Sequence, residues 1–157
     1  MVTQDKSRQK IMLTVKDLMT RDLFTLQATD NLALARSLMD LARIRHIPIV
    51  DHDMIFTGLI THRDILSATV SKLAGVDNQT QDELDMGIPV QEIMNIRVKT
   101  IHPDENLRDA AGLLLEQKYG CLPVVIDSKL VGILTEADFL SLTVSLMDAL
   151  EQDHNLS

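Results

Sequence analysis

The feature that most constrains this 157-residue chain is a pattern of three motifs that occurs twice. Residues 15–19 (VKDLM) resemble residues 90–94 (VQEIM), and the block Ile47-Pro48-Ile49-Val50 resembles Leu122-Pro123-Val124-Val125, both at a spacing of 75 residues. The third block, GLITHRD from Gly58, returns as GILTEAD from Gly132 at a spacing of 74 residues. Three matched blocks in the same order indicate duplication of one folding unit.

The hydrophobic pattern predicts the order strand, helix, strand, strand, helix within each unit. Apolar residues recur at helical spacing in the first predicted helix of each copy, and Asp30 or Asn31 could cap the earlier one. The predicted elements of the first copy are Phe24–Leu26, Asp30–Arg43, Ile47–Val50, Phe56–Ile60 and a helix after Thr61; those of the second are Val98–Ile101, Asp104–Gln117, Leu122–Ile126, Leu130–Leu134 and Glu136–Leu150.

Neither unit could bury the apolar face of its sheet alone, so we expect the two copies to pack through their sheets with pseudo-two-fold symmetry. The predicted fold class is therefore α/β, of the α+β kind. The expected organisation is an N-terminal tail over 1–14, a first repeat over 15–73, a linker over 74–89, a second repeat over 90–150 and a C-terminal tail over 151–157.

Composition argues against several functions. The net charge of −8 is unfavourable for binding nucleic acid, which requires a basic surface. No apolar run is long enough to cross a membrane, and the polar N-terminus is unlike a signal peptide. The single cysteine, Cys121, cannot form a disulfide within the chain and is expected to be a buried core residue. We therefore expect a cytoplasmic protein that associates with neither nucleic acid nor membrane.

The paired motifs resemble those of the cystathionine beta-synthase (CBS) domain, and two such repeats resemble a Bateman module. The resemblance spans Val15 to Leu142 and rests on Leu18-Met19 and Ile93-Met94, on the strands at Pro48 and Pro123, and on the two Gly-h-h-Thr-x-x-Asp blocks, where h is hydrophobic. It implies a regulatory module without catalytic activity that binds an adenosine ligand in clefts between the repeats. AMP, ADP and ATP are the usual ligands of the family, and S-adenosylmethionine is a less common one. It also implies a disc-like homodimer and a possible regulated protein partner.

The Thr-x-x-Asp part of each closing block suggests how such a ligand could be held. Thr61 ends a strand and begins a helix, where free backbone N–H groups attract anions. Its hydroxyl could contact a phosphate or ribose oxygen, and Asp64 could accept hydrogen bonds from the two ribose hydroxyls. Thr135 and Asp138 are the equivalents in the second copy. The same spacing also matches a capping box, in which these side chains satisfy only their own helix, and both interpretations stay open.

Local charge favours the first cleft over the second. His62 and Arg63 precede Asp64, whereas Glu136 and Ala137 precede Asp138. Arg45 stands three residues before Pro48, where the gamma subunit of AMP-activated protein kinase places a phosphate-binding arginine; Gly120 replaces it in the second copy. The full set of candidate binding residues is Arg45, His46, Ile47, Pro48, Gly58, Ile60, Thr61, His62, Arg63, Asp64, Lys99, Thr100, His102, Thr135 and Asp138.

Two other functions are compatible with a chain of this kind. An enzyme has little support, because the chain contains no Walker loop, no Gly-x-Ser-x-Gly elbow and no His-Glu-x-x-His motif. No metal site is expected from the spacing of the histidines, although Mg²⁺ could arrive with ATP. A dimerisation scaffold with vestigial pockets is the alternative. In either case we expect a homodimer formed through the helices after Asp64 and Asp138, because the last helix carries an apolar stripe at Leu140, Leu142, Val144, Met147 and Leu150.

Overall fold

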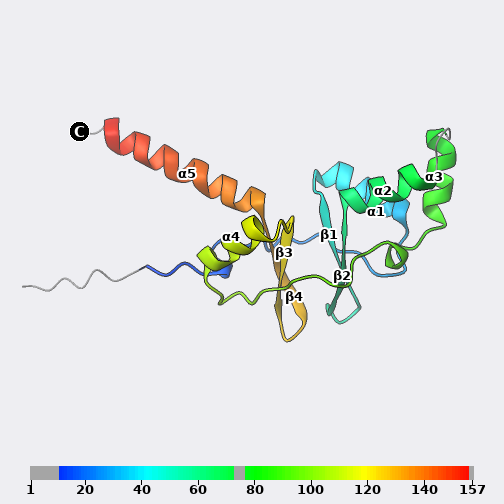
Figure 1. Ribbon diagram of the computed structural model, residues 1–157, viewed down its shortest axis with the longest axis horizontal. Helices are drawn as coiled ribbons and strands as arrows, with labels where there is room; N and C mark the ends of the chain where they lie inside the picture. Colours follow the sequence, from blue (N-terminus) through cyan, green and yellow to red (C-terminus); the bar gives the residue numbers. More distant parts are fainter. Residues whose placement is uncertain (1–10, 73–76, 156–157) are drawn as a thin grey trace, which may run out of the picture.

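The computed structural model describes residues 11–72 and 77–155, and it has the mixed α/β fold that the repeats predicted (Figure 1). Two β-hairpins lie side by side at the centre, with helices on their outer sides. The elements of the first half are η1 (Val15–Asp17), α1 (Leu32–Ala42), β1 (His46–Val50), β2 (Phe56–Thr61), α2 (His62–Lys72) and α3 (Asn78–Met86). Those of the second half are η2 (Val90–Glu92), α4 (Leu107–Glu116), β3 (Cys121–Ile126), β4 (Lys129–Thr135) and α5 (Glu136–Asn155).

The two hairpins are equivalent in register. In β1–β2, Pro48 is opposite Leu59, and in β3–β4, Pro123 is opposite Ile133, so the two prolines occupy equivalent positions as expected. Each sheet is two-stranded. The short strands predicted at 24–26 and 98–101 are wrong, because these segments contribute only single parallel bridges, Leu26 to Ile49 and Ile101 to Val124. The chain just before each of these segments is paired with the other hairpin. Each segment therefore crosses from one hairpin to the other and does not extend either sheet.

The repeats exchange their opening segments. Val15 and Met19 belong to the hydrophobic core that contains α4, β3 and β4 of the second repeat. Val90, with Ile93 and Met94 packed beside it, belongs to the core of α1, β1 and β2 of the first repeat. Packing therefore crosses the predicted sequence boundary between the repeats, and neither core is complete without residues from the other copy.

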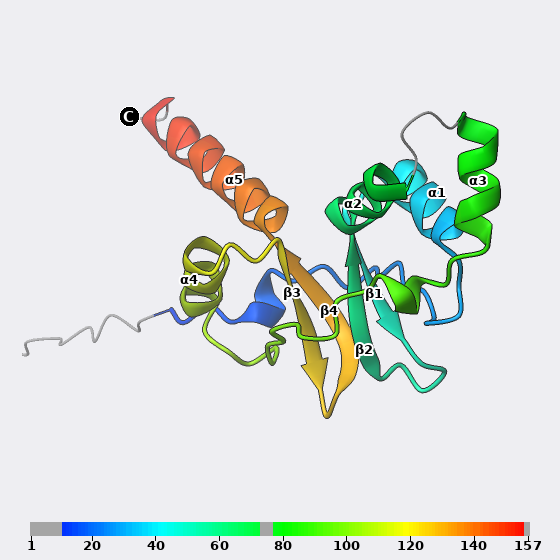
Figure 2. The ribbon, with the colours of Figure 1, turned by 45° about the vertical axis from the view of Figure 1, so that its right-hand side comes forward.

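Hydrogen bonds between the hairpins join the two halves directly. The N–H of Phe56 donates to the carbonyl of Ser128 at 2.9 Å, and the N–H of Leu130 donates to the carbonyl of Met54 at 3.0 Å. Figure 2 shows the hairpins next to each other in this arrangement. The expected packing of the repeats through their sheets is confirmed.

Side-chain caps determine where the first helix of each repeat begins. The side chain of Asn31 accepts a hydrogen bond from the Leu34 N–H at 2.9 Å, which starts α1 one residue after the cap. Asn106 caps α4 in the same way through the Asp109 N–H at 3.1 Å. Helix α4, the first helix of the second repeat, therefore begins after Asn106 and not at Asp104 as predicted, because the residues after Pro103 form a turn.

The predicted linker over 74–89 contains a helix that the pattern did not reveal. Residues 74–76 lie outside the described residues, and α3 follows them with Asp77 as its N-cap. The carboxylate of Asp85, only 1% exposed, accepts from Arg36 Nε at 2.9 Å and from Gln81 Nε2 at 2.6 Å. Arg36 also donates to Thr69 Oγ1 at 2.7 Å, which connects α1, α2 and α3. This network fastens the linker to the first repeat.

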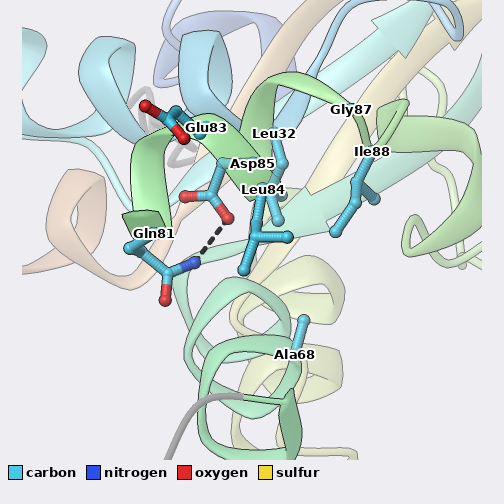
Figure 3. A pocket seen from close by; sticks show the side chains of 8 residues that line it. All are labelled: Leu32, Ala68, Gln81, Glu83, Leu84, Asp85, Gly87 and Ile88. Carbon is cyan, nitrogen blue, oxygen red and sulfur yellow. Dashed lines mark hydrogen bonds between the residues drawn. The ribbon is translucent and has the colours of Figure 1, made fainter. Parts of the chain in front are cut away.

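A cavity of about 510 Å³ lies beside this network, between α3 and the helices α1 and α2 (Figure 3). Its apolar lining includes Leu32, Leu84 and Ile88, and the side chains of Gln81 and Asp85 lie at its edge. None of the predicted binding residues contributes to its lining.

Helix α5 projects away from the rest of the molecule in both views (Figures 1 and 2). It has no buried residue, and Leu140, Leu146, Met147 and Leu150 are all more than half exposed. It also continues past Leu150 through most of the predicted C-terminal tail. Within residues 11–72 and 77–155, none of the helices combines the length and the apolar character that crossing a bilayer requires.

Candidate functional site

The closing block of the first repeat forms a complete capping box where β2 meets α2. The N–H of Thr61 donates to Asp64 Oδ2 at 2.8 Å, and the N–H of Asp64 donates to Thr61 Oγ1 at 3.1 Å. Both side chains therefore satisfy backbone groups of their own helix, as the capping interpretation requires. This arrangement uses only one oxygen of the carboxylate. Asp64 Oδ1 has no hydrogen-bond partner among the described residues, and the residue is only half-buried.

The closing block of the second repeat engages both of its carboxylate oxygens. The N–H of Thr135 donates to Asp138 Oδ2 at 2.8 Å, with the Thr135 hydroxyl at 3.4 Å from the same oxygen. The other oxygen, Oδ1, accepts a hydrogen bond of 2.8 Å from the hydroxyl of Thr20. The two aspartates thus have the same backbone contact but differ in the partner of the second oxygen.

The exchange of opening segments explains how Thr20 reaches Asp138. The backbone of Thr20 forms two hydrogen bonds with Ile133 in β4, at 2.9 and 3.0 Å. The corresponding residue 75 positions later is Asn95, whose backbone forms two bonds with Leu59 in β2, at 2.9 and 2.8 Å. The backbone is therefore equivalent in the two copies. The side chain of Asn95 instead turns back on its own segment, where its Oδ1 accepts the Arg97 N–H at 3.0 Å.

His46 lies where the two repeats meet, at the start of β1. A Cβ atom added to Gly120, which precedes β3, would collide with the His46 imidazole. The glycine at this position is therefore needed for the close approach of the ring. Burial lowers the pKa of His46 below its ordinary value, opposed by the negative charges of Glu136 and Asp64 and reinforced by Arg45. The ring thus lies within electrostatic reach of both helix starts, α2 and α5.

The predicted cations of the first cleft have no internal partner. The side chains of Arg45, Arg63 and Lys99 are exposed and make no hydrogen bond or ion pair with the described residues. The carbonyl of Arg45 accepts the N–H of His62 at 2.8 Å, which ties the start of β1 to the start of α2. This contact brings the backbones of Arg45, His62 and Asp64 into one region.

Lys99 and Thr100 lie on the segment that crosses between the sheets. This segment is anchored at one end by Asn95 against Leu59, and at the other by the Ile101 N–H, which donates to the Pro123 carbonyl at 3.0 Å. Lys99 and Thr100 therefore lie on a segment that contacts β2 at one end and β3 at the other. The sequence prediction that both residues contact a ligand stays a prediction.

Five other predicted binding residues occupy less suitable positions. The side chains of Ile47 and Ile60 are fully buried in the core, and Pro48 and Gly58 are also buried, so only backbone groups could face a ligand there. A Cβ at Gly58 would lie 2.8 Å from Met94 Sδ. His102 lies in the turn before α4, where its Nδ1 accepts the Asp104 N–H at 3.1 Å. These residues position the hairpin or the turn, and none of their side chains forms a hydrogen bond with Asp64 among the described residues.

Two functional candidates, Thr20 and Asn95, were missed from the sequence. They directly follow the matched Met19 and Met94, so extending the repeat comparison by one residue would have exposed a Thr-to-Asn difference. The pairing with Asp138 could not be read in this way, because it depends on the exchange of segments. The part of the chain described by the structure contains no group of three or more His, Cys, Asp or Glu side chains suited to hold a metal ion.

Comparison with known proteins agrees with the repeat structure. The family model of the CBS domain matches residues 15–71 and again residues 90–145. A CBS domain-containing protein of Dictyostelium discoideum is 32% identical over 136 residues, which cover 85% of this chain and 93% of that protein. Matches over nearly the full length of both proteins indicate similarity of the whole module.

Two similar solved structures contain adenosine ligands. CBSX2 of Arabidopsis thaliana in complex with AMP is 28% identical in sequence to this chain, and the two structures match with a TM-score of 0.71. The match covers 85% of this chain and 98% of that one. The CBS domain pair of protein MJ0100 in complex with 5′-methylthioadenosine and S-adenosyl-L-methionine is 26% identical, with a TM-score of 0.70 covering 86% and 98%.

Proposed function

Because the chain belongs to the CBS domain family, we propose that it is a regulatory module, without catalytic activity, that binds an adenine nucleotide in the cleft at Asp64. The observation that carries the proposal is the unpartnered Oδ1 of Asp64 beside a helix N-terminus. The ligands of CBSX2 and of the MJ0100 pair support an adenosine moiety. AMP, ADP or ATP is the expected class, with Mg²⁺ accompanying ATP, and S-adenosylmethionine is the alternative.

Different groups around Asp64 would bind the two parts of the ligand, the ribose and the phosphate. The carboxylate would accept hydrogen bonds from the ribose hydroxyls, since Oδ1 keeps its full accepting capacity. The N-terminal end of α2 carries a partial positive charge, which together with the unpaired Arg45 and Arg63 would favour phosphate. The capping box would hold Thr61 and Asp64 in place before the ligand arrives, which lowers the entropy lost on binding.

A thermal-shift screen tests this proposal. AMP, ADP, ATP, S-adenosylmethionine and NAD are added separately at saturating concentration to the full chain. A ligand that binds only the folded state raises stability by about 2.7 kcal/mol at one hundred times its dissociation constant. We expect one or more of the adenosine ligands to raise the melting temperature, with guanosine monophosphate as the negative control. If no adenosine ligand changes the melting temperature, the proposal is wrong.

The exposed apolar residues of α5 favour a second role, as a dimerisation surface that could transmit the bound state. Five apolar side chains that are each more than half exposed lie on this helix: Leu140, Val144, Leu146, Met147 and Leu150. Such a stripe is typical of a surface that a partner covers. We propose a homodimer in which α5 contributes to the interface, with a regulated protein as the alternative recipient of the signal.

Sedimentation of matched variants tests the dimer. Leu140→Glu places a charge on α5, and Leu41→Glu makes the same change at an 85% exposed position on α1. We expect the wild-type chain and Leu41→Glu to sediment as dimers at micromolar concentration and Leu140→Glu to shift toward monomer. A wild-type chain that is monomeric in this range contradicts the homodimer.

A further inference from the structure

We propose that Thr20 keeps the second cleft closed to adenosine ligands by occupying the carboxylate of Asp138. This inference rests on the proposed function, because it concerns which of the two similar closing blocks would bind the ribose better. The hydroxyl of Thr20 donates to Asp138 Oδ1 at 2.8 Å, across the junction between the repeats. It therefore occupies the oxygen that corresponds to the open Oδ1 of Asp64.

The position of Thr20 leaves its hydroxyl few alternatives. Its backbone is paired on both sides with Ile133, so the residue cannot move away without breaking two hydrogen bonds to β4. Rotation about χ1 would move the hydroxyl away from the carboxylate, but β-branched side chains such as threonine are restricted at χ1. The Thr20 hydroxyl takes up one of the accepting positions of Oδ1, so a ribose hydroxyl would meet a carboxylate with less accepting capacity than that of Asp64, or would have to displace the existing hydrogen bond.

The first cleft lacks this contact for a local reason. Asn95 has the same backbone pairing as Thr20, but its amide oxygen holds the Arg97 N–H in an Asx turn. The side chain therefore faces its own segment, and Asp64 Oδ1 stays open. The difference between Thr20 and Asn95 thus accounts for the different surroundings of the two Oδ1 atoms. The negative charge of Glu136 beside the second cleft would further disfavour phosphate. Among the described residues, Glu136 forms no hydrogen bond with the carboxylate oxygens of Asp138.

Calorimetry with AMP on paired variants tests the proposal. All variants carry Asp64→Ala, so that only the second cleft can bind through its aspartate. Thr20→Ala removes the hydroxyl, whereas Thr20→Ser keeps it. We expect Thr20→Ala to bind AMP at least about tenfold more tightly than the Asp64→Ala parent, which corresponds to ~1.4 kcal/mol. Thr20→Ser should bind as weakly as the parent. Thr57→Val, which removes a hydroxyl bonded to the Ile49 carbonyl, is the matched control and should also leave binding unchanged.

The reciprocal change is made in the otherwise wild-type chain. Asn95→Thr places a hydroxyl beside Asp64 and should weaken AMP binding by about tenfold. Circular dichroism confirms that each variant is folded before it is titrated. The inference is overturned if Thr20→Ala binds no better than Thr20→Ser, or if it binds less tightly than the parent, which would make Thr20 a ligand contact. A wild-type chain that binds AMP while these variants do not differ refutes this inference alone, whereas absence of AMP binding in every variant refutes the proposed function as well.

Discussion

The closing blocks at Asp64 and Asp138 have the same backbone geometry but different side-chain surroundings. In both, a threonine N–H donates to the aspartate Oδ2 at 2.8 Å, and the following helix begins at the next residue. The second oxygen is open in the first block and holds Thr20 in the second. Since the backbone contacts follow from the strand-to-helix turn, they survive duplication easily. The side-chain partners depend on single residues of the other repeat, and there the two copies have diverged.

The two repeats also differ in how the helix at the C-terminal side of each one is packed. The first repeat binds the linker helix α3 through Arg36 and the buried Asp85. Ala111 stands at the position equivalent to Arg36 in the second repeat, so no such ion pair can form there. Helix α5, the last helix of the second repeat, has no buried residue at all. The first half is thus closed around its own linker, whereas the second half presents a long exposed helix.

The largest predicted difference between the clefts is in ligand binding. Asp64→Ala removes the open carboxylate oxygen and the ribose contacts that it would make. Since a hydrogen bond to a charged group contributes about 1.5–3 kcal/mol, loss of two should weaken AMP and ATP by more than about a hundredfold. Asp138→Ala should change affinity by less than about threefold in calorimetry. If Asp138→Ala abolishes binding while Asp64→Ala preserves it, the assignment of the clefts is reversed.

A second prediction concerns the ion pair that only the first repeat contains. Arg36→Leu leaves the buried carboxylate of Asp85 with Gln81 as its remaining partner, so we expect the free energy of unfolding to fall by about 2–4 kcal/mol. Urea denaturation measures this change. Lys16→Leu is the control, because its pair with Asp104 is solvent-exposed on both sides and should contribute less than about 1 kcal/mol. Equal effects of the two substitutions would contradict a special role for the linker contact.

The hairpins could be predicted from sequence to within about one residue, whereas α3 could not. Pro48 and Pro123, with the glycine blocks that follow them, repeat at fixed spacing and mark each hairpin locally. The segment NQTQDELDM of α3 has little apolar periodicity, and its stability comes from Arg36, which is 49 residues from Asp85. A local pattern cannot report such a contact.

The candidate site likewise has one part that the sequence predicts and one part that it does not. Thr61 and Asp64 form the predicted capping geometry because both residues lie within one turn of the helix. The hydrogen bond from Thr20 to Asp138 joins residues 118 positions apart, and it exists only because the repeats exchange their opening segments. The charge difference between His62 and Glu136 was visible in sequence, but the occupied oxygen of Asp138 was not.

A third prediction separates phosphate from ribose recognition in the first cleft. Arg63 is exposed, lies in the first turn of α2 and has no partner among the described residues. Arg63→Ala should therefore weaken ATP by about tenfold, through loss of one charge-assisted contact, and should leave adenosine within about twofold. Calorimetry with both ligands in the same buffer measures the ratio. A parallel loss for adenosine and ATP would show that Arg63 acts on the fold of the cleft and not on phosphate.

The smallest predicted effect is the response of the two repeats to pH. His46 and Cys121 occupy equivalent positions at the starts of β1 and β3. Burial lowers the pKa of His46, with Arg45 acting in the same direction, while it raises the pKa of the Cys121 thiol to about 12. The pKa of His46 therefore lies on the acidic side of its ordinary value of 6.5, whereas the Cys121 thiol stays protonated through the acidic and neutral range.

The sign of this response follows from linkage. Because the folded-state pKa of His46 is below its unfolded value of about 6.5, the unfolded chain binds more protons in the interval between them. The contribution is fully present above about pH 6.5 and is lost as pH falls through the folded-state pKa. Urea denaturation at several pH values should show stability decreasing over this interval in the wild-type chain. His46→Gln should flatten the slope, whereas His52→Gln, in the exposed hairpin turn, should preserve it.

The carboxylates with lowered pKa values do not confuse this measurement. Hydrogen bonds from Thr14, Thr80 and Lys16 lower the pKa of Asp17, Asp77 and Asp104, respectively, below an ordinary value of 3.8. Their contribution to stability is present above that value and is lost as pH falls below it, so a loss of stability that begins just below pH 6.5 does not come from these carboxylates. A loss of stability just below pH 6.5 that persists in His46→Gln would therefore place the titrating group elsewhere. In that case the imidazole that lies against Gly120 would not be the source of a pH-dependent difference between the repeats.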